Sequence, residues 1–454
     1  MNNVQDTIST QQAKADVSAE QLKALVSEVL AEAKRQGASS AEASVSINHG
    51  LSATVRLGEV ETVEHNRDKG LALTLFFGKQ SGSASTSDFS PTAVRDCVRA
   101  AATIARYTAA DEFSGLADPE QLAREIPDLD LYHPWNPGVE RAIELARACE
   151  DAARADARIT NSEGASVSSH ESLDVYANSH GFVGATATTR HGISCAVIGE
   201  DESGMQRDYW YASARDQRDL DSPEAIGRQA ALRTVRRLSG RQLATRKTPV
   251  IYEAPVATSL LSHFIGAIRG SSLYRRSSFL LDHLGKPVFA PWVRIHEQPF
   301  LKKALGSTPF DNDGVAPANR DLVRDGILQG YVLDVYSARK LGLRSTGNAG
   351  GVHNLTIESG DKDFAALLRE MGTGLLVTEL IGFGVNTVTG DYSRGAAGFW
   401  VEQGEIQYPV EEITIAGNLK DMFTGLVAVA NDVDARGNIR TGSMLIESLT
   451  LAGS

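Results

Sequence analysis

The glycine-rich stretch from Glu379 to Asp421 limits the possible folds of this chain more than any other segment. Its glycines suit short strands joined by tight turns, and they are Gly382, Gly384, Gly390, Gly395, Gly398, Gly404 and Gly417. The alternation in Phe399-Trp400-Val401, followed by Glu402-Gln403-Gly404, predicts a hairpin arm and its turn. Apolar residues at helical spacing then predict a helix from Leu419 to about Val429. We therefore expect a β-rich centre with a helix packed on it.

The composition is that of a globular protein with room for a large core. A length of 454 residues predicts two or three domains, and 42% hydrophobic with 22% charged residues is ordinary. The net charge of -12 argues against a nucleic-acid partner. No apolar run is long enough for a transmembrane helix, and the polar start MNNVQDTISTQQAKADVSAEQ has no leader pattern. We expect a cytoplasmic protein without a membrane partner.

The order of patterns predicts an α+β protein with three units. We expect an N-terminal α/β unit at residues 18–115, a mostly antiparallel central unit at 138–240, and a β-rich C-terminal domain with packed helices at 248–454. Three unclustered cysteines fit a reducing compartment. Two of them, Cys97 and Cys149, lie in apolar helical patterns and are expected to be buried.

Local signals place several elements within the first two units. Ser18 as N-cap, with Gln21 completing a capping box, predicts a helix that stops at Gly37. Turns are predicted at Asp68-Lys69-Gly70, Gly78-Lys79 and His191-Gly192. A basic run follows the last helix of the central unit and is interpreted as a solvated helix end rather than an anion site; it comprises Arg233, Arg236, Arg237, Arg241, Arg246 and Lys247.

Recognition of a family rests on the segment NTVTGDYSRGAAGFWVEQGEIQYPVEEITIAGNLKDM, which begins at Asn386. This segment resembles the carboxy-terminal signature of the TldD/TldE (PmbA) family, and its GDYSRGAAGFWVE wording is similar to the PmbA (TldE) branch. The likeness extends from about Ala41 to Gly453. It implies a cytoplasmic role in metal-dependent proteolysis of small or unfolded peptides.

The resemblance also implies that this chain lacks the zinc motif of the TldD branch. That branch carries H-E-x-x-x-H in a helix, which matches the helix around Leu260-Leu261 here. Ser262 and Ala267 fall at the two ligand positions, and His263 falls at the glutamate position. A hydroxyl and a methyl cannot replace imidazoles on zinc, and histidine is no like-for-like substitute for a glutamate base. The late cysteine of that branch is also missing, since no cysteine follows Cys195.

The sequence contains no clear motif for nucleophilic catalysis, nucleotide binding or calcium binding. The chain has no G-x-S-x-G elbow, no P-loop and no dinucleotide loop. The segment Asp311-Asn312-Asp313-Gly314 is rich in oxygen ligands but lacks the glutamate of an EF-hand, so we interpret it as a turn.

The expected function is that of a PmbA/TldE-type subunit without a catalytic residue or cofactor of its own. Its partner would be a TldD-type chain that carries zinc, and alone it would form a homodimer. An exposed strand edge can hold an extended peptide through main-chain hydrogen bonds, and Arg275 and Arg276 can bind a peptide carboxylate bidentately. The residues expected to line this chamber are Ser262, His263, Arg275, Arg276, Asn386, Asp391, Tyr392, Ser393 and Arg394.

Two alternatives stay open. The chain can be a metallopeptidase in its own right, with an unrecognised metal site among four histidines, which are His263, His283, His296 and His353. No pair of them has the spacing that one helix would need, so packed or hydrogen-bonded histidines are favoured. The other alternative is a peptide-binding or chaperone-like module that holds its ligand without hydrolysis.

Overall fold

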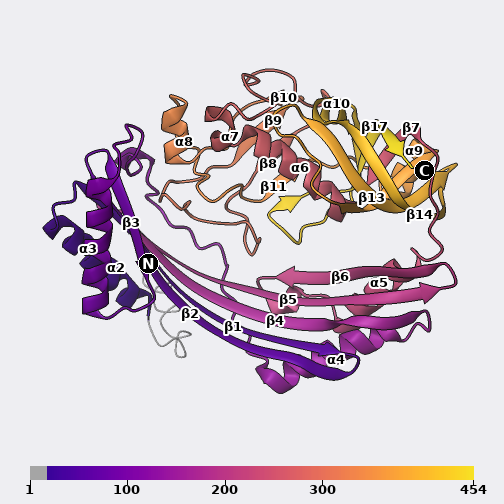
Figure 1. Cartoon of the computed structure of the whole chain (residues 1–454), viewed down its shortest axis with the longest axis horizontal. Helices are drawn as coiled ribbons and strands as arrows, with labels where there is room; N and C mark the ends of the chain where they lie inside the picture. Colours follow the sequence, from indigo (N-terminus) through magenta and orange to yellow (C-terminus); the bar gives the residue numbers. More distant parts are fainter. Residues whose placement is uncertain (1–17, 454) are drawn as a thin grey trace.

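A long curved sheet and a second, β-rich body make up the protein, and the computed structural model describes residues 18–453 of it. Helices cover the outer face of the curved sheet, and the C-terminal body lies on its concave side (Figure 1). This mixed architecture confirms the predicted α+β class. The boundaries of the three predicted units stay a prediction. Among residues 18–453, no helix combines the length and apolar character needed to cross a membrane.

The curved sheet is antiparallel throughout and has the strand order β3-β2-β1-β4-β5-β6. The predicted N-terminal and central units thus each contribute three strands to one sheet. In register, Val45 pairs with Leu71 on one side and with Val175 on the other. The strands are β1 (Ser40–Arg56), β2 (Glu59–Phe77), β3 (Gln80–Thr86), β4 (Ile159–Asn178), β5 (Val183–Asp201) and β6 (Gly204–Ala214).

Two of the predicted turns are wrong because the strands run through them. Asp68-Lys69-Gly70 lies inside β2, where it pairs with Asn48, Ile47 and Ser46. His191-Gly192 lies inside β5, where it pairs with β4 and β6 on both sides. The ladder satisfies these backbone groups, and that gain outweighs the preference of glycine for turns. The turn at Gly78-Lys79 is confirmed as the link between β2 and β3.

Helices bury the apolar face of this sheet in two clusters. The helices α2 (Ala19–Arg35) and α3 (Pro91–Tyr107) cover one half, and α4 (Gly138–Arg154) and α5 (Pro223–Val235) cover the other. The capping box of Ser18 and Gln21 is confirmed, with both reciprocal hydrogen bonds present. The short 3-10 helices η1 (Pro119–Gln121) and η2 (Gln217–Asp219) lie outside these layers. Cys97, Cys149 and Cys195 are buried free thiols.

The C-terminal body contains a six-stranded sheet with the order β14-β13-β12-β7-β17-β15. Strand β14 also pairs with β17, which closes five of these strands into a ring. A second sheet has the order β10-β9-β8-β11-β16. The first sheet comprises β7 (Arg246–Tyr252), β12 (Gly374–Ile381), β13 (Asp391–Glu402), β14 (Glu405–Asn418), β15 (Leu426–Val429) and β17 (Met444–Ala452). The second comprises β8 (Ile295–Glu297), β9 (Arg320–Arg324), β10 (Ile327–Leu328), β11 (Leu355–Ile357) and β16 (Ile439–Arg440).

Five helices complete this body, and one of them corrects a prediction. They are α6 (Ala254–Ile268), α7 (Gly270–Tyr274), α8 (Val335–Lys340), α9 (Phe364–Met371) and α10 (Leu419–Thr424). The helix predicted to reach Val429 ends at Thr424, because Gly425 caps it and the next residues pair with β17. The hairpin with its turn at Gln403-Gly404 is confirmed between β13 and β14.

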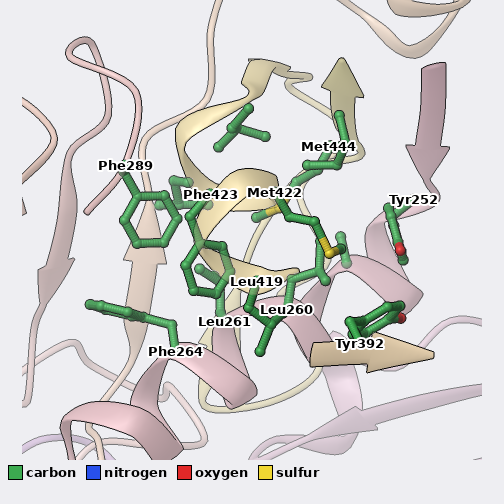
Figure 2. Close-up of a cluster of buried hydrophobic side chains, with 14 of the residues drawn as sticks. Tyr252, Leu260, Leu261, Phe264, Phe289, Tyr392, Leu419, Met422, Phe423 and Met444 are labelled. Carbon is green, nitrogen blue, oxygen red and sulfur yellow. The ribbon is translucent and has the colours of Figure 1, made fainter. Parts of the chain in front are cut away.

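A hydrophobic cluster fixes α6 inside the C-terminal body (Figure 2). Phe264 of α6 meets Phe289 edge on, with ring centroids 5.1 Å apart. Phe289 stacks on Phe423 of α10 at 4.5 Å. Burying each such side chain stabilises the fold by about 1.5–3 kcal/mol. The cluster therefore holds α6 in one orientation, and it sets the direction in which the polar side chains of this helix point.

Candidate functional site

Helix α6 places one polar edge against β13. The helix begins directly after β7, with Pro255 in its first turn, where the missing N–H costs nothing. Val256, Ser259 and His263 share one side of the helix, since they are spaced by three and four residues. Leu260, Leu261 and Phe264 are buried on the other side. Helical spacing thus directs His263 towards the strands rather than into the apolar cluster.

His263 lies against a pair of buried tyrosines. Its ring meets that of Tyr392 edge on, with centroids 6.1 Å apart. Tyr392 of β13 and Tyr252, the last residue of β7, are 1% and 0% exposed, and both lie at the rim of the apolar cluster in Figure 2. The Nε2 atom of His263 is buried and makes no hydrogen bond within residues 18–453, and the two buried phenols interact with each other. A buried imidazole nitrogen without a partner in the described chain therefore lies beside a pair of buried phenols.

Arg394 completes this group, which we call the His263 cluster (His263, Tyr252, Tyr392 and Arg394). Arg394 follows Tyr392 by two residues on β13, so both side chains project from the same face of the strand. Burial lowers the pKa of His263, and the positive charge of Arg394 lowers it further. Burial also raises the pKa of Tyr252 well above its usual value. At neutral pH the cluster therefore holds a neutral imidazole and two neutral phenols around one guanidinium.

A cavity of 290 Å³ opens beside Arg394, between the curved sheet and the C-terminal body. We call it the junction cavity. One wall comes from β6 and the other from the start of α6 and from β12. Its lining residues are Asp208, Tyr209, Trp210, Tyr211, Arg233, Pro255, Val256, Ser259, Thr378, Glu379, Leu380, Arg394 and Arg436.

The first three arginines of the basic run are built into this junction, and for them the interpretation as a solvated helix end is wrong, whereas Arg241, Arg246 and Lys247 are exposed as predicted. Arg233 is only 5% exposed; it contacts Asp208 at 3.3 Å and Glu253 at 2.8 Å. Arg237 pairs with Glu379 of β12. Carboxylates from β6 and from the C-terminal body converge on these arginines, which the sequence places far apart. Arg233, Arg236 and Arg237 therefore join the two bodies through ion pairs.

A larger groove of 820 Å³ runs along the concave face of the curved sheet. Hydroxyl and carboxyl side chains of the sheet face a loop at 308–312 across it. Burial raises the pKa of Asp311 to about 7, although three backbone N–H groups donate to its carboxyl. The turn predicted at Asp311 is confirmed by the hydrogen bond from the Gly314 N–H to the Asp311 carbonyl.

The predicted chamber residues fall into separate places. His263, Tyr392 and Arg394 come together in the His263 cluster, whereas Ser262 is exposed and donates to the Thr258 carbonyl at 3.0 Å. Arg275 and Arg276 are exposed at the end of α7. The rest lie around the turn before β13: Asn386, Asp391 and Ser393 are exposed, and Asp391 accepts from Thr389 and Asn418. That these residues line a peptide chamber stays a prediction.

The helix α6 does not offer a zinc site. Ser262 points outward, Ala267 is 0% exposed, and neither side chain is a zinc ligand. The other three histidines each bond a neighbour: His283 the Leu281 carbonyl, His296 the Gln298 side chain, and His353 the Gly347 carbonyl. Across residues 18–453, no three His, Cys, Asp or Glu side chains lie close enough to hold a metal ion.

Sequence reasoning missed several residues of this region. Tyr252, Thr378, Asp208 and Arg436 come from four distant segments, and none belongs to a motif. One signal was present for Tyr252, because a tyrosine that ends a buried strand just before the helix with His263 must lie near that helix. For Thr378 and Arg436 the sequence carries no signal, since their positions depend on a bulge and a loop.

Comparison with known proteins places three stretches of the chain in one family. Residues 41–105 match the description "PmbA/TldA metallopeptidase domain 1", residues 132–238 the "central domain", and residues 245–453 the "C-terminal domain". The "Metalloprotease PmbA" of Escherichia coli O157:H7 is 52% identical over 425 residues, which cover 93% of this chain and 94% of the relative.

Two further comparisons set the range of this similarity. The "Metalloprotease TldD homolog" of Haemophilus influenzae is 24% identical over 394 residues, covering 80% of each chain. A crystal structure from Bacteroides thetaiotaomicron, described as a proposed modulator of DNA gyrase, superimposes with a TM-score of 0.91 at 30% identity. That superposition covers 96% of this chain and all of the other.

Proposed function

This chain belongs to the PmbA/TldA metallopeptidase family, and from this premise we propose that it is the PmbA/TldE-type subunit of a cytoplasmic zinc metallopeptidase. It acts with a TldD-type chain, which supplies the zinc, and the substrates are small or unfolded peptides. Alone, the chain forms a homodimer and binds no metal.

The observation that carries this proposal is the chemistry of α6. Ser262, His263 and Ala267 occupy the positions that the family resemblance assigns to the zinc ligands and the base. None of the three restores that set, because the hydroxyl bonds its own helix and the methyl is buried. His263 faces Tyr392 and Arg394 instead of a second ligand. Hydrolysis by zinc therefore requires another chain.

Identity to the two branches of the family supports the same assignment. The chain is 52% identical to a PmbA protein but 24% identical to a TldD homologue. The role left to this chain is to bind and orient the peptide. The groove on the concave sheet face suits an extended peptide, because its hydroxyl and carboxyl groups can form hydrogen bonds with the N–H and C=O groups of a peptide backbone.

The test measures zinc and hydrolysis on the same untagged protein. We expect zinc per chain near zero by elemental analysis, and no cleavage of an unfolded peptide, followed by mass spectrometry, when the chain is alone. Addition of a TldD-type chain is expected to produce cleavage, and chelation of the zinc in that chain beforehand is expected to abolish it.

Two results would replace this proposal. Zinc near one per chain, with cleavage by the isolated chain, would make it a peptidase in its own right and would direct the search to His263, His283, His296 and His353. Peptide binding without cleavage, even with the TldD-type chain present, would make it a peptide-binding module.

A further inference from the structure

One arginine in the junction cavity has no carboxylate partner among the residues that the structure describes. Three arginines of the basic run pair with three carboxylates, which are Asp208, Glu253 and Glu379. Arg436 pairs with Asp434 at 2.6 Å. The side chain of Arg394, by contrast, makes no hydrogen bond and no ion pair with any residue from 18 to 453, and its Nε is buried.

Arg394 is half-buried. The desolvation of a charge is repaid only by an opposite charge or by hydrogen bonds, and Arg394 faces neutral groups, namely His263, Tyr252 and Tyr392. The two acids in the cavity wall, Asp208 and Glu379, are already held by other arginines. The cavity therefore favours an anion.

A second donor without a partner faces the same cavity. Thr378 is 5% exposed, lines the cavity, and has a buried hydroxyl without a hydrogen bond in the described chain. It is the extra residue at an irregularity in β12, where the register with β13 shifts between Val377 and Glu379. Bulges of this kind redirect a side chain at the cost of local pairing. Thr378 and Arg394 thus both line one cavity.

The opposite wall of the cavity is aromatic. Tyr209 and Tyr211 of β6 stack with ring centroids 6.3 Å apart, and Tyr209 is 50% exposed. Trp210 is already covered by Arg436, at 4.0 Å. A volume of 290 Å³ lies just below the usual range for small-ligand pockets, so only a small ligand group would fit.

We propose that the junction cavity binds a carboxylate, carried either by a small organic acid or by the C-terminal residue of a peptide. Arg394 is the ionic partner, the Thr378 hydroxyl is a second donor, and Tyr209 with Tyr211 contacts the apolar part of the ligand. Arginine is suited to this role, because its planar fork can bind both carboxylate oxygens. This inference rests on the cavity and does not require hydrolysis by the chain.

Calorimetric titration of the isolated chain tests the site with three probes. They are N-acetyl-phenylalanine, the tripeptide N-acetyl-Ala-Ala-Phe with a free carboxylate, and the same tripeptide as its C-terminal amide. We expect a free acid to bind at least about tenfold more tightly than the amide, a loss typical of a removed charged hydrogen bond. If the tripeptide acid binds more tightly than N-acetyl-phenylalanine, the ligand is the C-terminus of a peptide. If N-acetyl-phenylalanine binds equally or more tightly, the ligand is a small organic acid.

Three variants connect the binding to the named residues. Arg394→Gln is expected to lower the affinity for the free acid at least about tenfold and to leave the affinity for the amide unchanged. Thr378→Val is expected to lower the affinity for the free acid by a smaller factor. Arg228→Gln, at an exposed position of α5, is the matched control and should change nothing. Thermal unfolding checks that each variant is folded.

The outcomes that would overturn the site are specific. They are equal affinity for acid and amide, no binding of either acid at millimolar concentration, or unchanged affinity for the acid in both the Arg394→Gln and Thr378→Val variants. Because none of these measurements uses a TldD-type chain or cleavage, the carboxylate site can fail while the proposed function stands, and the reverse also holds.

Discussion

The imidazole of His263 meets the ring of Tyr392 edge on, with centroids 6.1 Å apart, and the guanidinium two residues further along β13 belongs to the same cluster. Helix α6 thus carries a neutral histidine next to a cation. The electrostatic environment of this histidine is opposite to that of a zinc ligand, whose second nitrogen usually donates to a carboxylate.

The pKa of His263 should respond to Arg394. Burial and the arginine charge both lower it below the ordinary value, so Arg394→Gln should raise it towards that value. We expect this shift in a proton NMR titration of the histidine ring signals. An equal pKa in both proteins would show that burial alone sets it. Arg228→Gln serves as the control and should leave the titration unchanged.

The same histidine contributes to the stability of the fold with a defined sign. Its pKa is lower in the folded chain than in the unfolded one, so the unfolded chain takes up the proton first as the pH falls. The free energy of unfolding should therefore decrease as the pH drops through about 6.5, the unfolded value, towards the folded pKa. Denaturant unfolding at pH values above and below about 6.5 measures this decrease. A His263→Gln variant should lack this part of the decrease.

Two glycine substitutions should change the free energy of unfolding in opposite directions. At Gly266 in α6, an added Cβ would meet nothing within 4 Å, so Gly266→Ala should raise the free energy of unfolding by about 0.5–1 kcal/mol. At Gly398 in β13, the Cβ would lie 1.8 Å from the Leu376 carbonyl oxygen of β12. Gly398→Ala should therefore cost about 1–3 kcal/mol. Denaturant unfolding measures both changes. A Gly398→Ala variant as stable as the wild type would contradict the close approach of β12 and β13.

Asp216 should stabilise the attachment of the C-terminal body to the curved sheet. This buried carboxylate accepts from Arg218 at 2.6 Å and from Lys303 at 2.9 Å. Hydrogen bonds from Arg218, with a further one from Lys303, hold its pKa well below the usual range. We expect Asp216→Asn to lower the free energy of unfolding at neutral pH by about 1–3 kcal/mol.

The pH dependence of that effect has a definite sign. Because the folded pKa is depressed, the stabilisation is present above about 3.9, the unfolded value, and is lost as the pH falls below it. The difference between wild type and Asp216→Asn should shrink in the same range. Asp156→Asn is the matched control, since Asp156 pairs with Arg158 in the same way at a more exposed site, where about 1 kcal/mol or less is expected.

Glu297 should be among the least replaceable residues of the C-terminal body. It is 1% exposed and accepts from the Asn348 side chain at 2.7 Å, the His353 N–H at 2.7 Å, and Arg320 at 2.9 Å. Its removal leaves these donors without a partner, so Glu297→Ala should cost about 3–5 kcal/mol. The exposed Glu358, which pairs with Arg294 at 2.6 Å, is the control, and Glu358→Ala should cost about 1 kcal/mol or less. Equal losses in urea unfolding would contradict the role of Glu297.

The sequence predicted those elements whose signals are local. The capping box at Ser18, the Gly78-Lys79 turn and the Gln403-Gly404 turn depend on contacts between near neighbours, and all three are present. That Ser262 and Ala267 stand at zinc-ligand positions stays a prediction, because it depends on the family resemblance. The capping box and the two turns follow from residue chemistry within one or two turns of chain.

Only the tertiary structure decided how distant segments meet. Asp68-Lys69-Gly70 forms strand instead of turn because β1 pairs with it, and Leu426–Val429 forms β15 because β17 lies beside it. Arg233 is buried because carboxylates from β6 and the C-terminal body surround it. Arg394 and Thr378 line one cavity, and Thr378 stands at a register shift in β12. Such placements depend on hydrogen bonds and charges between segments far apart in the chain, and a single sequence records neither their pairing nor their register.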